Sequence, residues 1–266
     1  MTRGNLFWGF VLVIVGILFL FSTLGLLKGV NPWDLIWPAF LIGIGLWILV
    51  GNLFGARFAK DARLVSIPLE GAASARVKIS HGAGRLVLDS HAGPGELLAG
   101  SFAGGVQSKV DRDGSEAKVK LRVPDQAFPF FNWGWSHSID WNIGLTRDIP
   151  VALEVSTGAN ETRLDLTELR ITELQVHTGA SATKVMLPAN AGSTRISCEG
   201  GAASFELQVP SNVAARIHYR GGLSSINVST TRFPRSGDVY QSPDYDTAVN
   251  KVDIEVQMGV GSVDVR

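Results

Sequence analysis

The sequence predicts a membrane anchor followed by an all-β domain, a β-solenoid or β-prism-like stack of strands. Two observations lead to this fold class. Residues 1–56 carry only three charged side chains, Arg3, Lys28 and Asp34, whereas residues 57–266 carry the remaining 45 of 48. Within the second segment, a glycine-centred pattern of alternating apolar and polar residues recurs about every 21 residues.

Two long uncharged stretches predict a helical transmembrane hairpin. Residues 4–27 and 35–56 contain 24 and 22 residues without a charge, and about 20 apolar residues suffice to cross the hydrocarbon core of a bilayer. The first stretch is too long for the apolar region of a signal peptide, and a second span follows it at once. We therefore expect a multi-pass anchor with two spans.

Small residues in the hairpin predict where its helices pack, and basic residues near it predict its orientation in the membrane. Small side chains let helix backbones approach closely in lipid, either within the hairpin or against the helices of a partner. Arg57, Lys60 and Arg63 follow the second span and Arg3 precedes the first, against Lys28 alone in the turn. The positive-inside rule then places both termini and the β-domain in the cytoplasm. The candidate helix-packing residues are Gly9, Gly16, Ala39 and Gly43.

Six glycines define the repeat in the second segment. Before each glycine, apolar and polar residues alternate, as in Leu153-Glu-Val-Ser-Thr-Gly158, and afterwards apolar residues resume at even offsets, as at Leu164 and Leu166. A two-residue period is typical of half-buried strands, and its recurrence indicates stacked rungs. We interpret the glycines as corners that need a positive φ; a two-sheet β-sandwich is the alternative. The predicted corners are Gly82, Gly158, Gly179, Gly201, Gly222 and Gly259.

The predicted organisation is a hairpin at residues 1–56, a linker and first strand entry at 57–74, and a β-repeat domain at 75–266. Two insertions interrupt the repeat, near residues 124–150 and 230–250. The first is rich in aromatic residues, so it either covers an open end or side of the stack or contacts a membrane surface or a ligand. The candidate contact residues are Phe130, Phe131, Trp133, Trp135 and Trp141.

The sequence offers no grouping that predicts a catalytic, cofactor or metal site. Cys198 falls in an apolar column of the repeat, which predicts a buried and inert thiol. The five histidines lack the spacing of metal ligands, and we expect them to face solvent. Equal numbers of basic and acidic residues, 24 of each, disfavour a nucleic-acid partner. We therefore expect a protein that is not an enzyme and binds no cofactor.

Two regions of the chain resemble a bacterial envelope-stress family. Residues 3–16, 33–38 and 43–47 are similar to the transmembrane region of LiaI/LiaF-type proteins. The motifs Val155-Ser-Thr-Gly-Ala159 and Val176-His-Thr-Gly-Ala180, with the stretch that ends at Val265, resemble the toastrack (LiaF-like) β-domain usually joined to it. The resemblance implies a protein of the bacterial cytoplasmic membrane, whose LiaF-like relatives restrain a membrane histidine kinase. This chain has one predicted hairpin, where LiaF carries two.

The sequence thus predicts a non-enzymatic, membrane-anchored β-repeat protein that acts by protein–protein contact in sensing or regulating envelope stress. Its expected partners are the lipid bilayer and a membrane histidine kinase or another envelope protein. Two alternatives remain open. One is a membrane-associated scaffold, a homo-oligomer joined through exposed strand edges. The other is a module that binds lipid headgroups or cell-wall precursors through the aromatic insertion.

Overall fold

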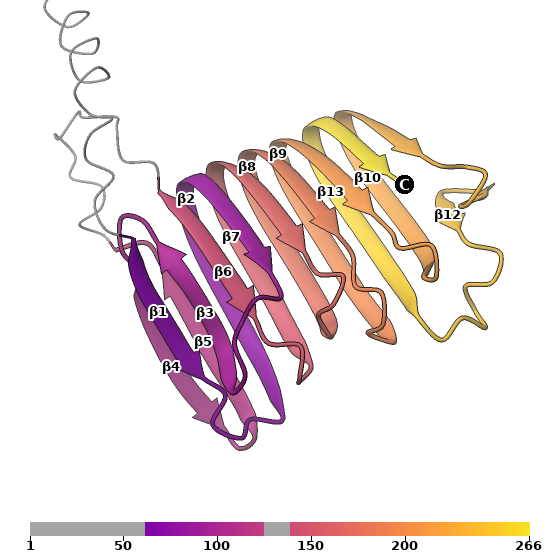
Figure 1. The fold of residues 1–266 in the computed structure, drawn as a ribbon. Helices are drawn as coiled ribbons and strands as arrows, with labels where there is room; N and C mark the ends of the chain where they lie inside the picture. The colour runs from indigo at the N-terminus through magenta and orange to yellow at the C-terminus, as the bar shows by residue number, and fades with distance from the viewer. Residues whose placement is uncertain (1–61, 125–138) are drawn as a thin grey trace, which may run out of the picture. The chain divides into compact units, whose positions relative to one another are not determined.

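The computed structural model describes residues 62–124 and 139–266, which belong to one compact unit (Figure 1). The predicted hairpin, with its candidate packing residues, lies outside the described residues, as do all candidate aromatic contacts except Trp141. These remain predictions. Among the residues that are described, no helix has the length and apolar character needed to cross a bilayer.

The described residues are all-β, with thirteen strands in a mixed sheet, so the predicted all-β class is confirmed. The bounds are β1 Arg63–Pro68, β2 Ser74–Asp89, β3 Glu96–Phe102, β4 Gln107–Asp113, β5 Glu116–Arg122, β6 Asp140–Leu145, β7 Val151–Asp165, β8 Ile171–Met186, β9 Ser193–Gln208, β10 Ala214–Val228, β11 Arg235–Ser236, β12 Val239–Gln241 and β13 Lys251–Val265.

Six long strands form the body of the fold. β2, β7, β8, β9, β13 and β10 lie side by side in that order, and neighbours pair in parallel along their length. Figure 1 shows each strand curving over at one edge, so that it runs through one layer and returns through a second. The pairing of β2 reflects these two layers, since its first half pairs with β5 and its second half with β6.

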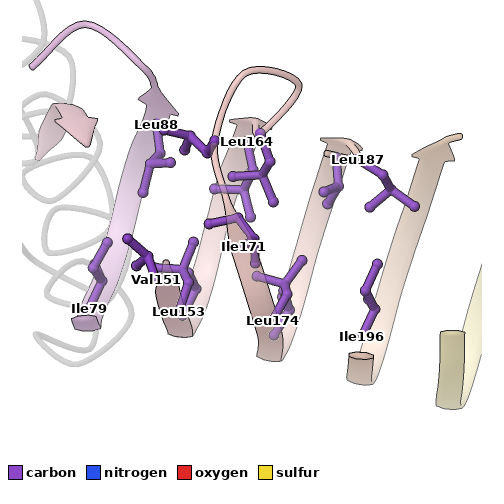
Figure 2. Packing of buried hydrophobic residues seen from close by; sticks show 14 of the residues in the cluster. Ile79, Leu88, Val151, Leu153, Leu164, Ile171, Leu174, Leu187 and Ile196 are labelled. Atoms are coloured by element: carbon purple, nitrogen blue, oxygen red, sulfur yellow. The ribbon is translucent and has the colours of Figure 1, made fainter. Parts of the chain in front are cut away.

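Burial explains why the apolar pattern changes parity at each glycine. In β2, Val77 and Ile79 are buried before the bend, and Leu86 and Leu88 after it. Ile79 and Leu86 are an odd number of residues apart, so a straight strand would point them to opposite faces. The bend takes up the extra residue and turns both halves toward a shared core. Figure 2 shows such side chains from successive strands packed between the layers.

The expectation of positive φ at the six corner glycines is wrong. Glycine is needed there because the backbones of neighbouring rungs come close together. None of the six is among the residues with positive φ. A Cβ placed on Gly158 would lie 2.5 Å from the carbonyl oxygen of Gly82, and one on Gly179 would lie 3.1 Å from that of Gly158. The same relation continues along the stack through Gly201, Gly259 and Gly222. A side chain at these corners would therefore collide with the backbone of the preceding rung.

The order of the last two rungs departs from chain order. After β10 the chain forms β11 and β12, and β12 pairs antiparallel with Arg216–His218 of β10. The chain then returns as β13, which lies between β9 and β10. Arg232 holds this excursion against the stack by donating to the carbonyl oxygens of Val209 and Val213, at 2.5 and 2.9 Å. The polar segment 230–250 thus covers one end of the first layer.

Shorter strands complete the other end of the stack. β5 and β4 extend the first layer beyond β2, whereas β6, β3 and β1 extend the second. β1 falls in the segment predicted as linker and strand entry, and β6 falls in the predicted aromatic insertion. Both are ordered parts of the sheet because their alternate residues, including Ile67, Trp141 and Ile143, are buried.

Candidate functional site

The bends of the long strands form one edge of the stack, which we call the corner edge. It consists of two adjacent rows of residues in register. The first row is the six corner glycines, and the second is the residue that follows each of them: Ala83, Ala159, Ala180, Ala202, Val260 and Leu223 in stacking order. Neither row contains a charged or hydrogen-bonding side chain, so the corner edge presents backbone and apolar groups.

Two large apolar side chains are exposed at the β10 end of the corner edge. Leu223 is 84% exposed and Val260 is 51% exposed, and the two are register partners on β10 and β13. Single exposed apolar residues are common on protein surfaces, but adjacent ones in an uncharged row are characteristic of contact surfaces. These residues were not singled out from the sequence, although the repeat alignment places both in the position after a corner glycine.

A shallow groove of about 620 Å³ lies beside the glycine row at the same end. Its polar lining includes His177, Glu199, Arg220 and Gln257. His177 Nδ1 lies 3.1 Å from a carboxylate oxygen of Glu199, and Arg220 donates to Glu255 at 3.2 Å. These ion pairs are exposed and of mixed sign, so the groove favours neither anions nor cations. It contains no serine or cysteine nucleophile, and its geometry suits a contact surface.

The described chain enters the stack beside the corner edge. Arg63, the first residue of β1, is the register partner of Phe102 on β3, and Phe102 is the partner of Trp141 on β6. Trp141 in turn pairs with Leu86, just past the bend of β2, so Arg63 lies near this bend. Pro124 and Ile139, which flank the segment not described, also lie here. Pro124 closely follows Arg122, the register partner of Ser80, and Ile139 accepts a hydrogen bond from His81.

His81 and Trp141 lie in the core at this first corner, which corrects two predictions. Trp141 is only 1% exposed, with its ring edge-on to Phe102 at 5.1 Å, so it cannot serve as a surface contact. His81 is 2% exposed, whereas we expected a solvent-facing histidine. Its Nε2 lies 2.8 Å from the carbonyl oxygen of Ile139, and its ring lies 5.1 Å from that of Trp141. The parity pattern contained this signal, because His81 occupies an inward position of its strand.

The buried His81 predicts a loss of stability in mild acid. Burial lowers its pKa from 6.5, although the Ile139 carbonyl and Asp140 oppose the shift. The unfolded chain therefore binds more protons than the folded one just below pH 6.5, and the free energy of unfolding falls as pH drops there, by at most about 1.4 kcal/mol per pH unit. Urea unfolding of detergent-solubilised protein between pH 7.5 and 5.5 measures this slope.

The matched comparison is between His81→Gln and His218→Gln, since His218 is a partly exposed histidine on β10. The Gln variant at position 81 should lose most of the slope between pH 7.5 and 5.5, because a neutral amide replaces the titrating ring. The variant at position 218 should keep it. An unchanged slope in His81→Gln would contradict the assignment of the acid sensitivity to this side chain.

Cys198 lies in the core of β9, in register with Val176 and Val256. It is fully buried, and burial raises the pKa of its thiol to about 12. Thiolate is the reactive form, so burial and the raised pKa disfavour reaction of this thiol in the folded protein. Among the described residues, no three His, Cys, Asp or Glu side chains gather as metal ligands would.

The geometry defines a class of protein: a stack of bent parallel strands with an uncharged edge that exposes Leu223 and Val260, and no catalytic constellation in the part described. The model of the N-terminal domain of toast_rack (DUF2154) matches residues 58–208, more than half of the chain, and the chain therefore belongs to the toast-rack family. The LiaI-LiaF-like transmembrane region matches residues 6–49, which confirms the expected joining of the two regions and indicates membrane anchoring at the N-terminal end. Neither is an enzyme family.

A solved structure shows the same fold at low sequence identity. A proposed cell adhesion protein from Clostridium sporogenes ATCC 15579 is 19% identical, with a TM-score of 0.70 over 76% of this chain and 97% of its own. A proposed adhesin from Bacteroides fragilis NCTC 9343 is 10% identical over 78% of this chain and 98% of its own, with a TM-score of 0.31. No curated protein matches the chain.

Proposed function

We propose that this protein is an accessory regulator of the bacterial envelope-stress response that acts by protein contact and catalyses no reaction. Its partner in this proposal is a membrane histidine kinase or another protein of the cytoplasmic membrane. Residues 1–56 form a two-span hairpin that meets the partner's helices, and residues 75–266 form the β-repeat domain. Both termini and the β-domain lie in the cytoplasm.

One observation carries the proposal: a LiaI-LiaF-like transmembrane region and a toast-rack domain follow one another in a single chain. Three further features support contact as the mode of action. The corner edge exposes Leu223 and Val260, the groove beside it has no serine or cysteine in its lining, and the thiol of Cys198 is buried. Together these favour recognition of another molecule over chemistry on a bound substrate.

Photo-crosslinking from the hairpin in native membranes tests the partner. A photoreactive residue at Gly16 or Ala39, on the small-residue faces, should capture a membrane histidine kinase or another envelope protein. The same residue at Val11, roughly on the opposite side of the first predicted helix, serves as the control. Equal capture from Val11 and Gly16, or no adduct from either small-residue face, would contradict a partner bound through the hairpin.

Reporters fused after Arg266 test the sidedness separately. One should be active only in the cytoplasm and the other only outside the membrane. We expect activity from the cytoplasmic reporter alone. More Lys and Arg residues lie before the first span and after the second than in the turn between the spans, and such residues favour the cytoplasmic side. Activity from the external reporter would overturn the orientation and favour direct sensing of wall material.

A further inference from the structure

The corner edge differs in chemistry from the opposite edge of the stack. Its two rows carry no charge, and its largest side chains are Leu223 and Val260. The opposite edge is formed by turns between strands and carries charged groups such as Arg147 and Glu168, which pair at 2.8 Å, and Arg170. The two rows of the corner edge carry no charge of their own to remove from water, although the charged side chains of Glu199 and Arg220 lie beside them in the groove.

The path of the chain relates the corner edge to the membrane. The second predicted span ends at Ala56, and β1 begins at Arg63 on the corner side of the stack. Seven residue steps reach at most about 25 Å when fully extended. β1 then runs away from the corner edge toward Pro68, so the chain enters the domain from that side.

β1, where the described chain begins, and the exposed apolar pair lie at opposite ends of the stack. β1 belongs to the end that extends from β2, whereas Leu223 and Val260 belong to β10 and β13. Five steps between neighbouring strands, from β2 to β10, span about 24 Å. A domain held only by the chain at one end could pivot. A second attachment at the other end, through two apolar side chains, would hold the whole corner edge against a surface.

We infer that the corner edge of the β-domain rests on the lipid bilayer, with Leu223 and Val260 inserted among the lipid headgroups. The inference rests on the proposed membrane anchorage of the chain. The flat row of glycines and alanines allows the backbone to come close to the bilayer surface, and the leucine and valine supply the apolar contact.

Fluorescence quenching on the full-length protein tests the inference. Leu223→Cys and, separately, Val249→Cys carry an environment-sensitive dye in vesicles of phosphatidylethanolamine and phosphatidylglycerol, with or without lipids spin-labelled near the headgroup. Val249 is the matched control because it is 85% exposed but lies just before β13, far from the corner edge. Native Cys198 stays unlabelled because it is buried. We expect spin-labelled lipid to quench the dye at position 223 and not at position 249.

A second variant and a flotation measurement separate the possible outcomes. Adding Val260→Asp to the labelled Leu223→Cys protein should abolish quenching while the protein still floats with vesicles through its anchor. Equal fluorescence with and without spin-labelled lipid at position 223, in protein that floats, would overturn lipid docking and leave the anchor intact. Protein that does not float with vesicles would overturn the anchorage itself, and the inference with it.

Discussion

Gly261→Ala is expected to destabilise the β-domain by roughly 3–5 kcal/mol, a large share of the about 5–15 kcal/mol by which an ordinary domain is stable. Two effects combine at this position. Gly261 has a φ of 136°, which L-residues with a side chain rarely adopt. A Cβ there would also overlap the carbonyl oxygen of Ala203 on the neighbouring strand β9. A backbone atom in a parallel ladder cannot rotate away, so either β13 or β9 must shift.

Two other glycines separate the contributions. Gly192 has a φ of 75° and open space around its Cα, so Gly192→Ala reports the backbone cost alone, about 1–2 kcal/mol. Gly179 has no positive φ, but its Cβ would lie 3.1 Å from the Gly158 carbonyl oxygen, so Gly179→Ala reports a mild collision alone. Thermal unfolding followed by far-UV circular dichroism should rank Gly261→Ala as the least stable of the three. Equal losses in Gly261→Ala and Gly192→Ala would contradict the collision.

The location of the corners could be predicted from sequence, but not the reason for the glycines. The apolar column of Ile79, Val155, Val176, Cys198 and Val256 is in register in the structure as the repeat alignment implied, because a two-residue period in a stack leaves few other registers. The contact between Gly158 and the Gly82 carbonyl involves residues 76 positions apart. Nothing local distinguishes it from a turn that needs a positive φ.

The position of β13 and the burial of Trp141 at the first corner were beyond sequence reasoning. Spacing along the chain describes consecutive rungs, whereas β13 inserts between β9 and β10 after an excursion of more than 20 residues. Trp141 lies in an aromatic-rich stretch that suggests exposure, whereas the alternation of β2 does place His81 on the inward side. Their burial depends on β6 joining the edge of β2, a pairing that links residues about 55 positions apart.

The candidate contact edge was partly visible in the sequence. Leu223 and Val260 directly follow the predicted corners Gly222 and Gly259, but alternation assigns a residue only to an inward or outward side. It does not show that outward positions after six glycines line up at one edge. That alignment, and with it the contrast between Leu223 and the charged turns of the opposite edge, requires the register of all six long strands.

Trp141→Ala is expected to cost about 3–5 kcal/mol of unfolding free energy, since it removes one of the largest fully buried side chains. Trp141 lies on β6, which pairs with β2 and β3, and its indole is edge-on to Phe102 and beside His81. Its Nε1 has no hydrogen-bond partner among the described residues, so Trp141→Phe should cost much less, under about 1.5 kcal/mol, by keeping an aromatic ring and removing an unpaired donor.

The contrast with a surface aromatic makes this prediction decisive. A tryptophan used for membrane or ligand contact could be replaced by alanine with little change in stability, within about 0.5 kcal/mol, as expected for Val249→Ala on the surface. Urea unfolding of Trp141→Ala, Trp141→Phe and Val249→Ala therefore assigns the residue. Stability that is unchanged in Trp141→Ala, together with lost binding to vesicles, would return Trp141 to the contact surface and contradict its place in the core. Unfolding of Trp141→Ala at lower urea, with vesicle binding retained, would show that the first corner has a structural role. There β6 pairs with both β2 and β3, and so joins the long strands to the shorter strands β3 and β1.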